Sequence, residues 1–141
     1  MNVLIKSVSG KVPEYKTQGA CAFDFESIAD ITINPQETAL VDTGTVIATP
    51  VGYCLVTSPR SSIYKNYGLI LVNSVWIIDQ DYCGDNDTIK FMYLNLKNEP
   101  VTIKAWERIW QWMFVKIEKA EFIPLKNMNS PDRWGYGTTG K

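Results

Sequence analysis

The sequence contains no histidine. Histidine is the side chain that most often acts as a general base near neutral pH, and it is the commonest neutral metal ligand. Acid–base chemistry in this chain must therefore use a carboxylate, Lys, Tyr or Cys. A hard cation held by carboxylates and phosphates is still compatible with the composition.

Cysteine and long apolar runs are also scarce. The three cysteines, Cys21, Cys54 and Cys83, form no CxxC pair, so neither a disulfide framework nor a thiolate metal cage is expected. The first residues lack a charged leader followed by an apolar stretch, which predicts no signal peptide. No apolar run approaches membrane-spanning length. Together these features predict a cytoplasmic protein with no membrane partner.

Net charge is almost absent as well, at −1 over 141 residues. This excludes a broad basic field that would attract a nucleic-acid polymer. A phosphate ligand would have to be held locally by a few Arg side chains, backbone N–H groups or a metal. The composition, 45% hydrophobic and 12% aromatic, predicts one packed domain.

Short runs rich in β-branched residues dominate the chain and predict strands. These runs are 3–5, 39–41, 45–47, 53–57, 69–72, 88–96, 101–103 and 112–115. In 88–96, apolar residues occupy both alternating sets, so both faces of this strand are expected to be at least partly covered. Many short strands favour an all-β sandwich, barrel or jelly roll. A single short helix is predicted at 61–65, with Ser61 as its cap.

The C-terminal residues, 127–141, have a different composition. They show almost no apolar periodicity and contain several glycines, which predicts a mobile tail after a single β domain at 1–126. Arg133 and Tyr136 lie within or beside its Gly/Thr stretch, a composition that can close over a phosphate. The alternative is a flexible tail without a binding role.

Two other segments carry candidate chemistry. Asp79 follows the apolar pair Ile77-Ile78, where a carboxylate can be partly desolvated and hydrogen-bonded to a water, as a general base requires. The commoner role of such a residue is an Asp that caps a turn. The segment 59–62 offers Arg60 and two hydroxyls for phosphate oxygens, or an N-cap beside a surface Arg.

Five segments of the chain, taken in order, resemble the five motifs of the trimeric dUTPase family. They are 22–25, 59–62, 73–84, 108–111 and 133–140, and they span nearly the whole chain. The resemblance implies a jelly-roll-like β-clip subunit in a threefold homotrimer, with each site built from all three chains. It also implies Mg²⁺-dependent hydrolysis of dUTP to dUMP and pyrophosphate, with residues 127–141 as an arm over a neighbouring site.

The resemblance further implies roles for individual residues. Asp79 would activate the attacking water, and Asp24 would position Mg²⁺ through its water shell. Uracil and deoxyribose would be held by Asn73, Ile78 and Tyr82. The phosphate chain would be bound by Arg60, Ser61, Ser62 and Gln111, with Arg133, Gly137, Thr138 and Thr139 closing over it and Tyr136 stacking on uracil.

The five tryptophans depart from this resemblance in a consistent way. Trp76, Trp106, Trp110, Trp112 and Trp134 occupy positions where the family usually has glycine or another small residue. Adding an indole where no side chain fits costs about 1–3 kcal/mol or more, and a positive φ adds a backbone penalty. The pattern leads to the hypothesis that the source organism reads the UGA codon as glycine.

Two other functions remain open from the sequence. A dCTP deaminase shares the fold and an Arg-Ser-Ser segment, but residues 78–82 and the glycine-rich tail favour a dUTPase. A regulatory or nucleotide-binding protein with weak or no turnover is the other alternative, because tryptophans replace small residues within the motifs.

Overall fold

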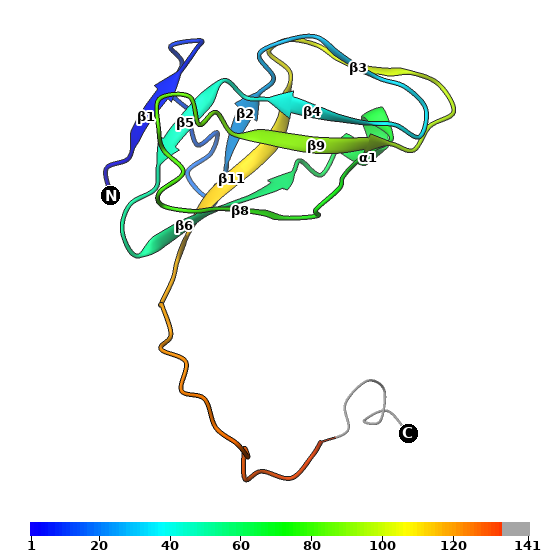
Figure 1. Cartoon of the computed structure of the whole chain (residues 1–141). Coiled ribbons are helices and arrows are strands. Elements are labelled where there is room, and N and C mark those ends of the chain that lie inside the picture. Colours follow the sequence, from blue (N-terminus) through cyan, green and yellow to red (C-terminus); the bar gives the residue numbers. More distant parts are fainter. Residues whose placement is uncertain (134–141) are drawn as a thin grey trace.

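A computed structural model of the chain describes residues 1–133 (Figure 1). Over these residues the regular structure is β-strand, apart from one five-residue helix. The elements are β1 (Leu4–Ser7), β2 (Phe23–Glu26), β3 (Ile31–Ile33), β4 (Thr38–Asp42), β5 (Thr45–Ala48), β6 (Tyr53–Pro59), α1 (Ile63–Tyr67), β7 (Leu69–Leu71), β8 (Trp76–Ile78), β9 (Lys90–Asn95), β10 (Val101–Ile103) and β11 (Arg108–Lys116). The all-β class predicted from the sequence is confirmed.

The strands form four antiparallel sheets around one core. The largest has the order β2-β11-β6-β8, and the next has the order β4-β9-β7. The pairs β1-β5 and β10-β3 complete the body. No two neighbouring strands in these sheets follow one another in the sequence. For example, β11 lies between β2 and β6. This crossed connectivity gives the jelly-roll-like fold.

The helix begins later than predicted. It spans Ile63–Tyr67 rather than 61–65, and the N-cap is Ser62 rather than Ser61, with no hydrogen bond from its side chain. The reason is a turn at the end of β6, where the Ile63 N–H donates to the Arg60 carbonyl at 3.0 Å. Gly68 ends the helix with φ 68°, a conformation that favours glycine.

β9 shows which faces of the strands are buried. Phe91, Tyr93 and Asn95 are buried in the core, and Met92 and Leu94 on the opposite face are half-buried, so both faces are at least partly covered, as predicted. The opposite face of the β4-β9-β7 sheet carries Leu40 paired with Met92 and Ile70 paired with Leu94. We call these four residues the outer apolar face. In one chain Leu40 is 48% exposed and Ile70 38%, so this face is only partly covered.

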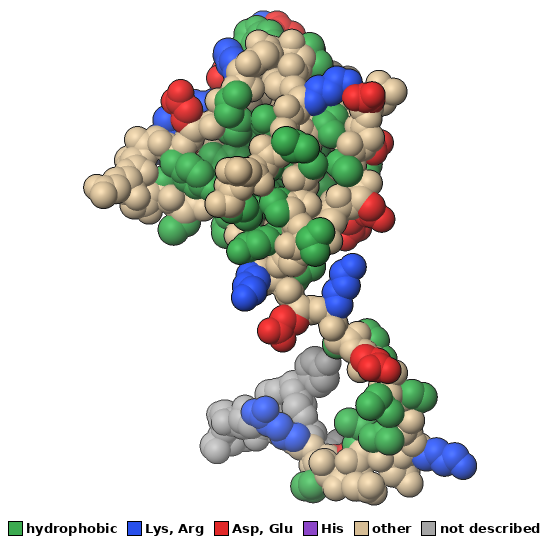
Figure 2. Space-filling model, turned by 90° about the vertical axis from the view of Figure 1, so that its left-hand side faces the viewer, with side chains coloured by type: hydrophobic (Ala, Val, Ile, Leu, Met, Phe, Trp, Pro, Cys, Tyr) green, Lys and Arg blue, Asp and Glu red, His purple; other side chains and the backbone are tan. Residues whose placement is uncertain are grey.

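The chain leaves the body after β11 (Figure 1). The Ile117 N–H donates to the Gly52 carbonyl at 2.9 Å, and residues 118–133 then run without regular secondary structure. Figure 2 shows this extended segment and, above it, hydrophobic side chains gathered on the face next to β1 and β5. Met1, Val3, Ile5 and Phe114 are among the residues that line an apolar hollow of about 210 Å³ there. No helix within residues 1–133 is long and apolar enough to cross a membrane.

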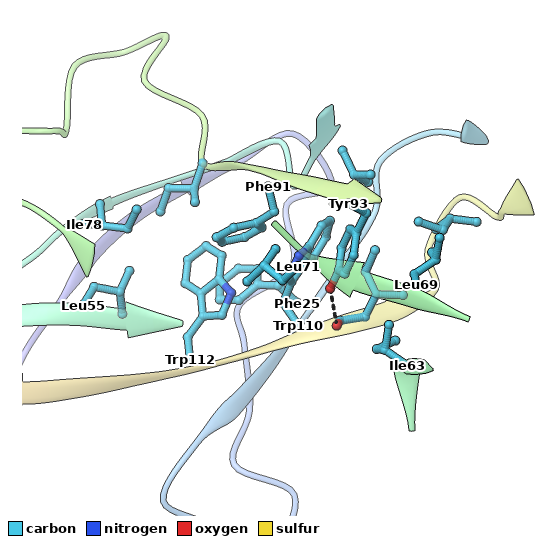
Figure 3. Close-up of a cluster of buried hydrophobic side chains, with 14 of the residues drawn as sticks. Phe25, Leu55, Ile63, Leu69, Leu71, Ile78, Phe91, Tyr93, Trp110 and Trp112 are labelled. Carbon is cyan, nitrogen blue, oxygen red and sulfur yellow. Dashed lines mark hydrogen bonds between the residues drawn. The ribbon is translucent and has the colours of Figure 1, made fainter. Parts of the chain in front are cut away.

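The core lies between the two larger sheets and is rich in aromatic side chains (Figure 3). Phe91 and Tyr93 from β9 meet Trp110 and Trp112 from β11. The Tyr93 hydroxyl donates to the Ile109 carbonyl at 3.1 Å, and burial raises the pKa of Tyr93 well above its usual value. The hydroxyl therefore remains protonated and links the sheets at any physiological pH.

Candidate functional site

The carboxylate of Asp24 lies between two guanidinium groups. Its Oδ1 is 3.3 Å from Nε of Arg60, and its Oδ2 is 3.2 Å from Nη1 of Arg108. Arg60 also donates through Nη1 to the Arg108 carbonyl at 3.2 Å. Gln111 lies opposite Asp24 on β2 and opposite Ser58 on β6. We call Asp24, Arg60, Arg108 and Gln111 the Asp24 cluster.

A β-bulge in β11 makes this cluster. The register with β2 shifts between Arg108 and Trp110, so Arg108 pairs with Glu26 while Gln111 pairs with Asp24. Residues three apart on a regular strand point to opposite faces, but the extra residue of a bulge brings them to the same face. Arg108 and Gln111 therefore both lie beside the Asp24 carboxylate, and Trp110 turns into the core.

The charges of the cluster suit a phosphate group. Two guanidinium groups face one carboxylate, which leaves an excess of positive charge at a partly exposed surface. Planar guanidinium groups bind phosphate oxygens through paired, charge-assisted hydrogen bonds. Gln111 adds an amide that already donates to the Ser58 hydroxyl and the Pro59 carbonyl, each at 3.3 Å. Ser61 is exposed and Ser62 half-buried directly after Arg60.

A second group of predicted residues lines a pocket between β8 and β9. The pocket has a volume of about 390 Å³ and is mostly apolar. We call it the hairpin pocket; its lining residues are Leu40, Trp76, Ile77, Ile78, Asp79, Tyr82, Ile89 and Lys90. Ile78 is buried, and the Tyr82 hydroxyl donates to the Thr88 carbonyl at 3.2 Å. The apolar side chains of the pocket could pack against a flat apolar ligand, with the Asp79 carboxylate at the edge of the pocket.

Asp79 is exposed on the surface of the single chain. Of the two roles that the sequence left open, a partly desolvated carboxylate beside Ile77 and Ile78 or an Asp in a turn, the single chain shows the residue in a turn. The reason is that β8 ends at Ile78 and a turn begins, in which the Tyr82 N–H donates to the Asp79 carbonyl at 3.4 Å. Within residues 1–133 the carboxylate accepts no hydrogen bond, which leaves both oxygens available to a water.

The comparison with known proteins decides the family. The dUTPase family pattern matches residues 9–140. The deoxyuridine 5'-triphosphate nucleotidohydrolase of Fusobacterium nucleatum is 34% identical over 98% of this chain and 95% of that protein. The enzyme of the same name from Finegoldia magna is 36% identical over 97% of this chain and 96% of that protein. The chain belongs to the dUTPase family.

Solved dUTPase structures share the fold. The dUTPase of Streptococcus mutans has a TM-score of 0.76 at 27% identity, covering 84% of this chain and 98% of that one. The Staphylococcus bacteriophage 80alpha dUTPase with dUPNHPP has a TM-score of 0.86 at 20% identity, covering 99% of both chains. The expected all-β, jelly-roll-like subunit of the dUTPase family is thus confirmed.

A single chain does not bring the Asp24 cluster and the hairpin pocket together. Ile78 pairs with Leu55 near the start of β6, whereas Arg60 follows its other end. Five residues of extended strand separate these positions by about 17 Å. In addition, Asp24 lies on β2 at one edge of the sheet and β8 forms the opposite edge. Asp79 is therefore remote from the Asp24 cluster of its own chain.

The remaining predicted residues lie apart from both groups. Asn73 is exposed in the turn before β8, nearer to the Arg60 end of the ladder. Arg133 is exposed on the extended segment beyond the body (Figure 1). The other predicted tail residues lie outside the described part of the chain; they are Tyr136, Gly137, Thr138 and Thr139.

Arg108 was missing from the predicted site residues. It lies in the segment 108–111 that resembles a family motif, but no role was predicted for it. Arg108 reaches Asp24 because a bulge shifts the register of β11 against β2, and residue spacing in the sequence does not reveal a bulge.

Proposed function

We propose that this member of the dUTPase family hydrolyses dUTP to dUMP and pyrophosphate. The Asp24 cluster carries the proposal, because it offers two arginines for a polyphosphate. Two relatives of the chain are named deoxyuridine 5'-triphosphate nucleotidohydrolases, which supports the proposal. The hairpin pocket supplies the complementary feature, an apolar slot with a free carboxylate at its rim.

Asp79 is the proposed general base. Its carboxylate takes a proton from a water whose oxygen attacks the α-phosphorus of dUTP. The bond from this phosphorus to the bridging oxygen then breaks, and pyrophosphate leaves while dUMP keeps the new oxygen. The exposed position of Asp79 in one chain would give way to a drier one once substrate and a neighbouring chain cover the pocket.

The other predicted residues bind and orient the substrate. Ile78 and Tyr82 pack against uracil and deoxyribose, and Asn73 hydrogen-bonds the uracil edge. The triphosphate lies against Arg60, Ser61, Ser62 and Gln111, to which we add Arg108 because of its contact with Asp24. The arm, residues 127–141, closes over this nucleotide through Arg133, Gly137, Thr138 and Thr139, with Tyr136 stacked on uracil.

A magnesium ion fits the Asp24 cluster when it arrives with the substrate. Residues 1–133 hold no group of three Cys, Asp or Glu side chains that could form a metal cage. Mg²⁺ usually retains several waters and binds through one or two carboxylates together with substrate phosphates. Asp24 supplies one such carboxylate, suited to contact through water because Arg60 and Arg108 already pair with it. The bound ion would neutralise charge on the triphosphate.

A homotrimer accounts for the division of the site. Asp79 and the Asp24 cluster lie far apart in one chain, so a complete site needs residues from different chains. The outer apolar face provides one surface for such contacts, and the hollow beside β1, on the face drawn in Figure 2, provides another. In this arrangement residues 1–126 form the β domain, and the arm reaches a neighbour's site. A cytoplasmic location agrees with the supply of free nucleotides.

One observation favours a second candidate function. Trp76 lines the hairpin pocket beside Asp79, and its indole occupies space that a base would use. A nucleotide-binding regulatory protein with weak or no turnover would tolerate this.

The test measures pyrophosphate release from dUTP, dCTP, dTTP and UTP with Mg²⁺. It uses the chain with its five tryptophans and a variant with glycine at all five positions. We expect release from dUTP alone, and Asp79→Asn should lower kcat about 10²–10⁴-fold, as expected for loss of a general base, with little change in KM. Tight dUTP binding without release would favour the regulatory protein, ammonia release from dCTP would indicate a deaminase, and no activity in either background would reject the proposal.

A further inference from the structure

Trp106 has a backbone conformation that suits glycine. Its φ is 68°, whereas the other non-glycine residues with positive φ in the described chain are the polar residues Gln36, Ser74 and Asn129. A bulky side chain in this region is a true outlier. Glycine adopts the same conformation at no steric cost.

The surrounding turn, rather than the indole, imposes this conformation. The Glu107 N–H donates to the Lys104 carbonyl at 3.2 Å, so Trp106 is the third residue of a four-residue turn. A positive φ at the third residue defines the turn type that selects glycine there. The Trp106 N–H donates to the Ser27 carbonyl at 2.6 Å, which fixes the turn against the body. The indole is 47% exposed, with the Lys11 ammonium 5.1 Å from the ring centre.

Three other tryptophans leave a polar atom unsatisfied. The Nε1 atoms of Trp76, Trp110 and Trp112 are buried, and none has a hydrogen-bond partner within residues 1–133. An indole N–H can only donate, and buried tryptophans usually find an acceptor. The same core does satisfy Tyr93, whose hydroxyl donates to Ile109 (Figure 3). Among residues 1–133 the hydroxyls of Thr49 and Thr57 are the other buried side-chain atoms without a partner, so the tryptophans account for three of the five such atoms.

These three indoles occupy one continuous region around Phe91. The ring centre of Phe91 lies 5.6 Å from Trp76, 4.9 Å from Trp110 and 5.8 Å from Trp112. Removal of one indole would leave a cavity held open by the other two. Because all three indoles contact Phe91, their substitutions are expected to be coupled rather than additive, and they are best tested together.

We propose that the working protein carries glycine at all five tryptophan positions, because its source organism reads the UGA codon as glycine. All four tryptophans of the described chain show a defect that glycine removes, in the backbone at 106 and in hydrogen bonding at 76, 110 and 112. No phenylalanine or tyrosine of residues 1–133 has a positive φ. Trp134 lies outside the described residues, and the proposal extends to it because the same reading of the UGA codon would apply to every tryptophan position. The proposal does not depend on the reaction that the protein catalyses.

The direct test examines the gene and the protein from its source organism. All five codons should be UGA, and mass spectrometry of the purified native protein should find glycine in each peptide concerned. Its intrinsic fluorescence should come from tyrosine alone. UGG codons, or peptides with tryptophan at these positions, would overturn the proposal.

A test on recombinant protein uses stability rather than activity. Trp106→Gly should raise the melting temperature of the chain, whereas Trp106→Ala should not, because alanine keeps the strained φ. A lower melting temperature for Trp106→Gly would show that the indole and Lys11 stabilise the turn, and would contradict the proposal.

The complete variant, with glycine at all five positions, should fold and melt at a higher temperature than the chain with tryptophans. A matched control, Phe91→Gly, should melt at a lower temperature, because Phe91 has no such defect. A five-glycine variant that melts lower or fails to fold would reject glycine at these positions. Both readouts are independent of dUTP, so a failure of the proposed function would leave them unchanged.

Discussion

Arg60 uses its guanidinium group twice within the Asp24 cluster. Nε contacts the Asp24 carboxylate and Nη1 donates to the Arg108 carbonyl, so the plane of the group is fixed before any ligand binds. Such an arrangement leaves the remaining N–H groups oriented toward a phosphate. A lysine at this position keeps the positive charge, but its single ammonium group cannot contact the Asp24 carboxylate and the Arg108 carbonyl in the same fixed geometry.

We therefore predict that Arg60→Lys raises KM for dUTP roughly tenfold while changing kcat much less, because ground-state phosphate binding is weakened. Steady-state kinetics of pyrophosphate release would measure both constants. Lys116→Arg, exposed at the end of β11 away from Arg108, is a charge-preserving control that should leave KM nearly unchanged. An unchanged KM for Arg60→Lys would remove Arg60 from phosphate binding.

The candidate residues were foreseen from the sequence to different degrees. Asp24, Arg60 and Gln111 came from the resemblance of their segments to family motifs, and the structure places them together. Their contact with Arg108 was not foreseen, because it depends on a bulge that local residue preferences do not encode. Whether Asp79 is desolvated or exposed could not be decided from the sequence, because the apolar pair before it does not reveal that β8 ends at Ile78 and a turn begins.

At the scale of elements, Asn95 connects three parts of the fold. Its side-chain amide, fully buried, donates to the carbonyls of Ile33 in β3 and Glu99 in the turn before β10. Its Oδ1 accepts the Lys97 N–H at 2.9 Å. The side chain thus fixes the β10-β3 pair to the end of β9.

Asn95→Ala should lower the free energy of unfolding by about 3 kcal/mol, because three backbone groups lose a partner in a buried place. Urea denaturation would measure the loss. Asn66→Ala, an exposed substitution on α1, is the control and should change stability by no more than about 0.5 kcal/mol. A similar small change for Asn95→Ala would show that water replaces these hydrogen bonds.

Asp30 makes a pH-dependent contact at the turn that holds Trp106. The hydrogen bond from the Lys104 side chain lowers the pKa of Asp30, and the N–H of Ala105 lowers it further. A carboxylate with a lowered pKa in the folded state stabilises the protein above its unfolded pKa, and this contribution is lost as pH falls through the folded value.

Asp30→Asn should therefore lower the melting temperature at neutral pH, and the difference from the parent should shrink as the pH is taken below the normal range of Asp. Thermal melts from pH 7 to pH 3 would show this convergence. A constant difference across the range would mean that shape, rather than charge, accounts for the effect.

The elements were predictable where the pattern of residues was long enough. β-branched runs identified eight strands, and each predicted run contains or overlaps an observed one. β2, β3 and β8 were not predicted as strands, although β7 and β10 are equally short and were. In β2 the two phenylalanines alternate with Asp24 and Glu26, and these residue types are depleted in strands. The late start of α1 follows from the turn after Pro59, which helix propensity does not reveal.

At the scale of the whole molecule, exposed apolar surface indicates association. The outer apolar face leaves large side chains in water in a single chain, and so does the hollow beside β1, on the face shown in Figure 2. A contiguous surface of this kind usually marks a contact with another chain. If the site is the one proposed, the separation of Asp79 from the Asp24 cluster means that this association is required for catalysis.

Ile70→Lys should weaken the assembly, because it places a charge on the outer apolar face without altering the lining of the hairpin pocket. Light scattering over a range of concentrations should find trimers in the parent and smaller species in the variant. The activity per chain should fall with dilution in parallel. A variant that stays trimeric would exclude this face from the interface.

The central claim, that hairpin and phosphate-binding residues of different chains form one site, is tested most directly by mixing two inactive variants. Asp79→Asn and Arg60→Ala chains are unfolded and refolded together, in whichever background, tryptophan or glycine, is active. Random mixing in a closed homo-oligomer should restore up to about a quarter of the parental dUTP hydrolysis, because some sites then combine intact residues from both chains. No hydrolysis from assemblies that mass spectrometry shows to contain both variants would mean that each site lies within a single chain.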